Sequence, residues 1–169
     1  MEYLFDKVNE NPELKGKTYL SHCFIPGAID NKKQEEVAEK LAAAQIGINS
    51  TIPIGRLIMP IPTLYKYGVK MMTGNDSIAD LWNSFGSGSV LQKVRRMAEL
   101  YGYTTELGLS RSLRLATADD LLLDEKGNQQ WPKMGHYANL TFLDASCSSE
   151  AVARVSPVKS IVYKRNLVF

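Results

Sequence analysis

Residues 85–115 read FGSGSVLQKVRRMAELYGYTTELGLSRSLRL and bring together a small-residue loop, a helical pattern and an alternating pattern. In the last part, residues 104–116, leucines and polar residues alternate over most of the segment. The leucines are Leu107, Leu109, Leu113 and Leu115. A period of two is typical of a β-strand that buries one face. We therefore predict a strand over residues 104–116.

The middle of this stretch predicts a helix that starts at Ser89 and ends at Gly102. Its apolar residues recur at helical spacing, with Val94 and Met97 on one face. The loop before it, Ser87-Gly88-Ser89, is a candidate anion-binding loop, because free backbone N–H groups and the helix dipole both favour negative charge. The alternative is a plain joint in which Ser89 caps the helix. The loop matches no nucleotide-binding motif.

The remaining segments predict helices early in the chain and strands late. A helix begins at Asp30 or Asn31 and closes at Gly47, and a strand covers residues 17–25. Three prolines between residues 51 and 72 predict extended edge structure or a long loop. We predict a hairpin over residues 121–131 and further strands over residues 137–143 and 160–169. The fold class is then α+β, a mostly antiparallel sheet with about three helices packed on one face.

Length and composition predict a single globular domain, residues 1–169. The chain is 44% hydrophobic and 22% charged, which is close to the globular average. No apolar run reaches the roughly 18 residues of a membrane span, and the first residues lack a signal-peptide layout. We expect a cytoplasmic protein, not bound to a membrane, with Cys23 and Cys147 as reduced thiols.

Basic residues are unevenly spread, although the net charge is only +2. They gather in residues 90–115 and near the carboxyl terminus, where a shared face would bind a polyanion. The candidate nucleic-acid-binding residues are Lys93, Arg95, Arg96, Arg111, Arg114, Lys164 and Arg165, with Tyr65 and Tyr67 as stacking groups. The leading hypothesis is a non-enzymatic accessory protein of a virus or mobile element that binds RNA or single-stranded DNA.

Two alternatives stay open at this point. The apolar, proline-bearing residues 52–64 would be the contact surface of an assembly or inhibitor protein with a protein partner. His22 and His136 would be the acid and base of a metal-independent phosphodiesterase or ribonuclease, since imidazole titrates near neutrality. No residue spacing indicates a metal site or a cofactor. The oligomeric state does not follow from the sequence.

Overall fold

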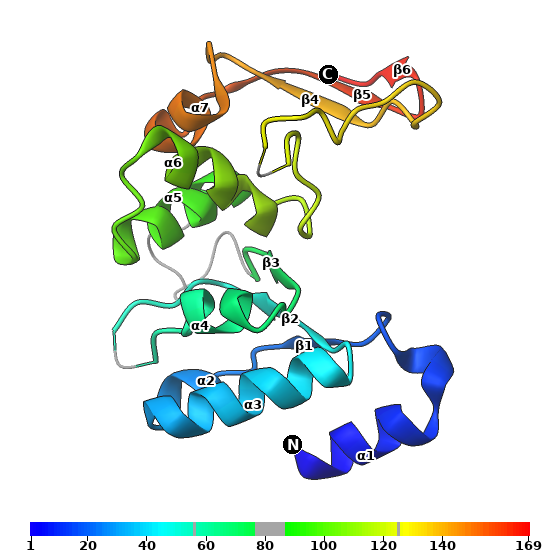
Figure 1. Ribbon diagram of the computed structural model, residues 1–169. Coiled ribbons are helices and arrows are strands. Elements are labelled where there is room, and N and C mark those ends of the chain that lie inside the picture. The colour runs from blue at the N-terminus through cyan, green and yellow to red at the C-terminus, as the bar shows by residue number, and fades with distance from the viewer. Residues whose placement is uncertain (56, 77–86, 125) are drawn as a thin grey trace. The chain divides into compact units, whose positions relative to one another are not determined.

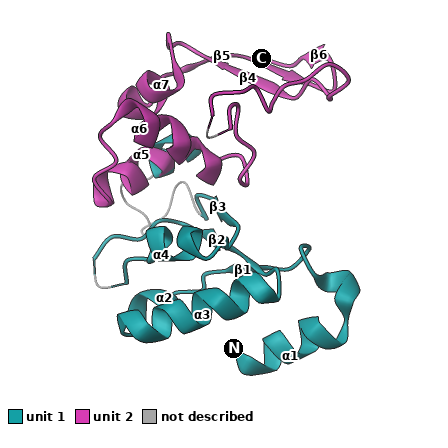
Figure 2. Ribbon diagram, viewed as in Figure 1, with its two compact units in different colours: residues 1–93 teal, residues 94–169 magenta. Residues whose placement is uncertain are grey.

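A computed structural model describes residues 1–55, 57–76, 87–124 and 126–169. The chain divides into two compact units, residues 1–93 and 94–169 (Figure 2). Each unit is described by itself.

Unit 1 is built around a three-stranded parallel sheet with the strand order β1-β2-β3 (Figure 1). Its strands are β1 (Tyr19–Ser21), β2 (Gly47–Ser50) and β3 (Met71–Thr73). Its helices are α1 (Glu2–Glu10), the 3-10 helix η1 (Pro12–Leu14), α2 (Ile25–Ala28), α3 (Asn31–Ala43) and α4 (Ile61–Lys66). Parallel neighbours need a crossover connection, which α3 supplies between β1 and β2, and α4 between β2 and β3.

The core of unit 1 is formed by the paired strand residues Ile48 and Met71 and by residues of the crossover helices. Ile48 and Met71 are partners in register and are both fully buried. Leu41 of α3 and Leu64 of α4 are fully buried as well. The helix predicted from Asp30 is confirmed, because the Asp30 side chain accepts a hydrogen bond from the Lys33 backbone N–H at 3.0 Å.

The prediction of extended edge structure or a long loop over residues 51–72 is wrong for residues 61–66, which form α4. Pro62 occupies the first turn of α4, where the missing N–H has no helical acceptor to lose. Tyr65 and Tyr67 therefore belong to a helix and its carboxyl-terminal cap rather than to a strand.

Unit 2 combines helices with a three-stranded antiparallel sheet of order β4-β5-β6. The helix α5 (Val90–Leu100) spans the boundary between the units. The other elements are α6 (Glu106–Ser112), the 3-10 helix η3 (Leu113–Leu115), β4 (Leu140–Leu143), α7 (Ser148–Arg154), β5 (Val158–Tyr163) and β6 (Asn166–Leu167). The helices α6 and α7 pack against each other, and Leu115 and Val152 are fully buried.

The strand predicted for residues 104–116 is wrong, since the segment is helical. Thr105 caps α6 by accepting a hydrogen bond from the Gly108 N–H at 3.1 Å. Ser112 is buried, and its hydroxyl donates to the Gly108 carbonyl at 2.8 Å. The alternation of leucines thus reflects two short helical turns, not a pleated strand.

The predicted fold class is also wrong. The described residues form two small sheets, one parallel and one antiparallel, rather than a single mostly antiparallel sheet. Helices outnumber the three that we expected. The predicted hairpin over residues 121–131 retains one isolated bridge, Leu123 to Gln129. Among the described residues, no helix combines the length and apolar character needed to cross a membrane.

Candidate active site at the carboxyl end of the parallel sheet

A histidine and an aspartate meet where the strands of the parallel sheet end. His22 follows β1 directly, and Asp76 follows β3 after Gly74 and Asn75. The His22 Nε2 lies 3.3 Å from the Asp76 Oδ1, and both side chains remain partly exposed. In open α/β sheets, ligands bind outside the carboxyl ends of the strands. The pair therefore stands where this architecture places reactive side chains.

The backbone after each parallel strand turns through an unusual conformation. His22 (φ 56°), Ile52 (φ 52°) and Asp76 (φ 64°) all have positive φ, and each lies within three residues of the end of a different strand. This region is uncommon for residues other than glycine and is an outlier for a β-branched residue such as Ile52. Such conformations persist only where the surrounding structure enforces them, and they cluster at functional sites.

Neighbouring groups help to fix the orientation of His22. The Phe24 ring meets the imidazole edge-on, with 5.9 Å between the ring centroids and 80° between the ring planes. Aromatic pairs favour this T-shaped arrangement. Cys23 lies between these two residues, and partial burial raises the pKa of its thiol, which keeps the thiol protonated.

Hydrogen bonds join the ends of β2 and β3, the strands next to the His22–Asp76 pair. The Thr73 hydroxyl donates to the Ser50 carbonyl at 2.7 Å, and the Ser50 hydroxyl accepts from the Ile52 N–H at 3.2 Å. The Asn75 Nδ2 donates to the Gly88 carbonyl at 2.6 Å. These bonds hold the backbone that leads from β3 to Asp76.

Imidazole nitrogen and carboxylate oxygen are also common metal ligands. Among the described residues, no group of three or more histidines, cysteines, aspartates and glutamates could hold a metal ion. His22 and Asp76 would supply two ligands, fewer than a structural or catalytic zinc site takes from protein. The described residues therefore do not form a metal centre by themselves.

The candidate anion loop is engaged in capping its own helix. The Ser87 N–H and hydroxyl both donate to the Gln92 Oε1, at 3.2 Å and 2.9 Å. The Ser89 hydroxyl accepts from the Gln92 N–H at 3.4 Å, as a cap does, and the Ser89 N–H donates to the Ser87 hydroxyl at 3.4 Å. Two amides of this loop thus already have acceptors, and anion binding at Ser87, Gly88 and Ser89 stays a prediction.

The predicted basic residues of α5 and α6 differ in burial and in pairing, so they do not form one exposed face. Lys93 is only 1% exposed, so it does not belong to a solvated basic face. Arg95 pairs with Glu99 at 2.8 Å, while Arg96 and Arg111 are partly buried.

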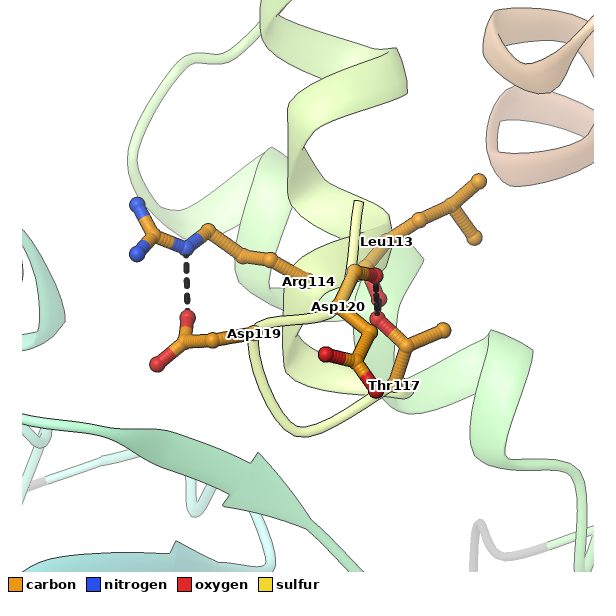
Figure 3. A network of polar contacts seen from close by, with 5 residues as sticks. All are labelled: Leu113, Arg114, Thr117, Asp119 and Asp120. Carbon is orange, nitrogen blue, oxygen red and sulfur yellow. Dashed lines mark hydrogen bonds and ion pairs between the residues drawn. The ribbon is translucent and has the colours of Figure 1, made fainter. Parts of the chain in front are cut away.

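Arg114 belongs to a local network in unit 2 (Figure 3). Its Nε donates to the Asp119 Oδ1 at 2.7 Å, and both side chains are largely buried. The Thr117 hydroxyl bonds to the carbonyls of Leu113 and Asp120 in the same turn. The network closes the turn after η3, which is a structural role for Arg114.

The remaining predicted residues lie on other elements. Lys164 and Arg165 form the exposed turn between β5 and β6. The Lys66 ammonium lies over the Tyr67 ring, 5.3 Å from its centroid, and pairs with Glu35 at 2.9 Å. His136 is exposed, and its Nδ1 accepts from the Lys133 N–H at 3.2 Å. His136 belongs to unit 2 and His22 to unit 1.

Asp76 is the site residue that sequence reasoning missed. Gly74-Asn75-Asp76-Ser77 has the composition of a turn and a helix cap, which hides a second role for the carboxylate. A carboxylate a few residues after a buried strand is a usable signal only once that strand is known to be parallel to the strand that ends before His22.

No known family model matches the chain. The uncharacterized protein YahJ of Escherichia coli (strain K12) is 44% identical over 169 residues, which are all of this chain and 37% of that protein. Thus the chain spans less than half the length of this curated relative.

Solved structures share the fold at low sequence identity. N-isopropylammelide isopropylaminohydrolase from Burkholderia multivorans has a TM-score of 0.79 and 18% identity over 99% of this chain and 42% of its own. A 5-methylcytosine deaminase from Klebsiella pneumoniae, bound to phosphonocytosine, has a TM-score of 0.78 and 21% identity over 98% of this chain and 43% of its own. A triazine hydrolase variant has a TM-score of 0.54 and 17% identity.

These neighbours overturn the leading hypothesis from the sequence. They are hydrolases and a deaminase, so the prediction of a non-enzymatic, nucleic-acid-binding accessory protein of a virus or mobile element is wrong. The phosphodiesterase alternative built on His22 and His136 is not supported either, because the neighbours' names describe an aminohydrolase, a deaminase and a triazine hydrolase. Contact with a protein partner through residues 52–64 stays a prediction.

Proposed function

We propose that this chain carries part of the active site of a hydrolase that replaces an amino substituent of a nitrogen heterocycle with oxygen from water. The observation that carries the proposal is the His22–Asp76 pair, 3.3 Å apart at the carboxyl end of the parallel sheet. The shared fold supports it, because the neighbours' names describe an aminohydrolase and a deaminase of such heterocycles.

The reaction needs a base for water and an acid for the leaving nitrogen. The water oxygen adds to the ring carbon that bears the amino group, the C–N bond breaks, and ammonia leaves. Asp76 accepts a proton from the water, and His22, within reach of Asp76, delivers a proton to the departing nitrogen. The hydroxyl left on the ring carbon becomes a carbonyl as its proton passes to the adjacent ring nitrogen, so one water is consumed for each ammonia released.

The geometry assigns roles to residues of this chain alone. The matched region is 42–43% of the deaminase and aminohydrolase chains, so the proposal concerns only residues within that region. His22 and Asp76 are the catalytic residues that we assign here, with Phe24 as a positioning residue for His22.

The test is ammonia release by the purified protein from 5-methylcytosine and from ammelide. These heterocycles occur in the names of the deaminase and of the aminohydrolase. We expect both His22→Gln and Asp76→Asn to lower kcat/KM by about 100-fold or more, since general acid–base groups contribute roughly 10²–10⁴-fold. Both substitutions keep the side-chain size close to the original and remove the titratable group.

His136→Gln is the matched control, because it removes the other histidine of the chain, which is exposed and lies in unit 2. We expect it to retain activity within about twofold, since surface substitutions away from a site have small effects. The proposal is wrong if the purified protein releases no ammonia from either compound, or if His136→Gln loses as much activity as His22→Gln.

A further inference from the structure

Asn49 occupies the central strand of the parallel sheet, between the two strands that lead to the catalytic pair. It is in register with Ser21, the last residue of β1, and with Met72 of β3. His22 follows Ser21 directly, and Asp76 follows β3. A substrate bound against the His22–Asp76 pair therefore lies next to the end of β2, close to Asn49.

The carboxamide of Asn49 has an acceptor without a hydrogen bond. Its Oδ1 is shielded from solvent, and no donor among the described residues reaches it. A Cβ built on Gly74 would lie 3.6 Å from both the Oδ1 and the Nδ2 of Asn49, an ordinary van der Waals contact, so Gly74 lies beside the amide without a side chain of its own. The side chain of Met72, its neighbour in register, has no donor to offer.

Most buried polar side-chain atoms are hydrogen-bonded, and an exception at a site calls for an explanation, of which a ligand that supplies the donor is one. Asn75 also has an unpaired Oδ1, but its Nδ2 is fixed by the Gly88 carbonyl. The Asn49 residue is only partly buried, and torsions that end in an amide are broad, so its carboxamide can turn toward the strand ends.

We propose that Asn49 is a specificity residue whose Oδ1 accepts a hydrogen bond from a ring N–H of the heterocyclic substrate. The inference rests on the proposed function, and it names the ring N–H as the substrate group that the site recognises. A neutral amide suits a neutral ring N–H, because it stabilises the bound ring without adding a charge beside Asp76. A site built to bond an N–H rejects the analogue that lacks it.

The experiment compares 5-methylcytosine with 1,5-dimethylcytosine, in which a methyl group replaces the ring N1–H. In the intact protein we expect Asn49→Leu to lower kcat/KM for 5-methylcytosine by about tenfold or more and to change the value for the dimethyl compound by less than about threefold. Asn49→Ala gives the same selective loss and serves if the leucine variant folds poorly.

Asn31→Leu is the matched control, because it makes the same exchange at an exposed position at the start of α3 in the same unit. Asn31→Leu should leave kcat/KM unchanged for both substrates. An equal loss for the two substrates in Asn49→Leu shows a structural role and overturns the inference, while the proposed function stands.

Calorimetric binding of the same two compounds separates the remaining outcomes. Selective loss of affinity for 5-methylcytosine in Asn49→Leu, without any hydrolysis by the unaltered protein, supports the binding role of Asn49 and refutes the proposed function. If the unaltered protein neither hydrolyses nor binds either compound, both the proposed function and the role of Asn49 are wrong.

Discussion

His22 and Asp76 make contact across the end of the strand that separates them. Their parent strands, β1 and β3, are the two outer strands of the parallel sheet, with β2 between them. Strands two positions apart are separated by roughly 9–10 Å, yet the His22 Nε2 and the Asp76 Oδ1 are 3.3 Å apart. The two side chains thus extend toward each other past the end of β2, and a change in one is expected to affect the other.

A double-mutant cycle tests this coupling. If His22 and Asp76 act as a unit, the variant with both His22→Gln and Asp76→Asn should lose no more than about threefold beyond the worse single variant. The measurement is kcat/KM for ammonia release. Losses that multiply would show that the two residues act independently.

The cap of α6 gives a test of local structure in unit 2. Thr105→Ala removes the acceptor for the Gly108 N–H and should lower the free energy of unfolding by about 1 kcal/mol. Thr105→Ser keeps the hydroxyl and should stay close to the original stability. Urea unfolding followed by circular dichroism measures both. An alanine variant as stable as the serine variant would contradict the cap.

Close packing between β1 and β2 leads to a third prediction. A Cβ at Gly47 would overlap the Tyr19 ring and would lie 3.1 Å from the Lys70 carbonyl. Gly47→Ala should therefore lower the free energy of unfolding by about 1–3 kcal/mol, the usual cost of overpacking. Adding Tyr19→Ala removes the ring and should recover part of that loss relative to Tyr19→Ala alone. Strictly additive effects would argue against the overlap.

The loop around Asp124 should weaken in acid. The Asp124 carboxylate accepts hydrogen bonds from the Lys126 and Asn128 backbone N–H groups, both at 2.8 Å. Bonds from Asn128, the largest cause, hold the pKa of Asp124 below its ordinary value. The folded loop is thus favoured above the ordinary pKa and loses this support as the pH falls through the lowered pKa.

Amide hydrogen exchange at Asn128 reports this change. Corrected for the intrinsic pH dependence of exchange, its protection should fall between about pH 5 and about pH 2. Asp124→Asn cannot ionise and should make the protection independent of pH in that range. Persistence of the pH dependence in Asp124→Asn would assign it to another group.

Local signals in the sequence were sufficient to predict a helix where a capping residue marks its start. Asp30 supplies a cap, so the start of the helix is predicted and found in α3. The predicted stop at Gly47 is wrong, because α3 ends at Ala43 and Gly47 begins β2. Residues 104–116 mislead because four leucines in a short segment satisfy a period of two and also the turns of two short helices. The helical signal there is Thr105 followed by Glu106, a cap with an acid in the first turn.

The candidate site was only half visible for a different reason. His22 attracts attention as one of two histidines, whereas Asp76 has no distinctive neighbours in sequence. Their proximity depends on β1, β2 and β3 being parallel, which is a property of long-range pairing. Periodicity reports which residues face a core, but it does not report the direction of the neighbouring strand.

In unit 1 the buried core residues are separate from the residues of the candidate site. Ile48, Met71 and Leu41 are buried, while His22 and Asp76 stand in irregular backbone beyond the strand ends. Such connecting segments tolerate replacement better than a core does. Under the proposed function, a few changes at the strand ends would alter which substrate binds while the buried scaffold stays unchanged, which makes the architecture evolvable.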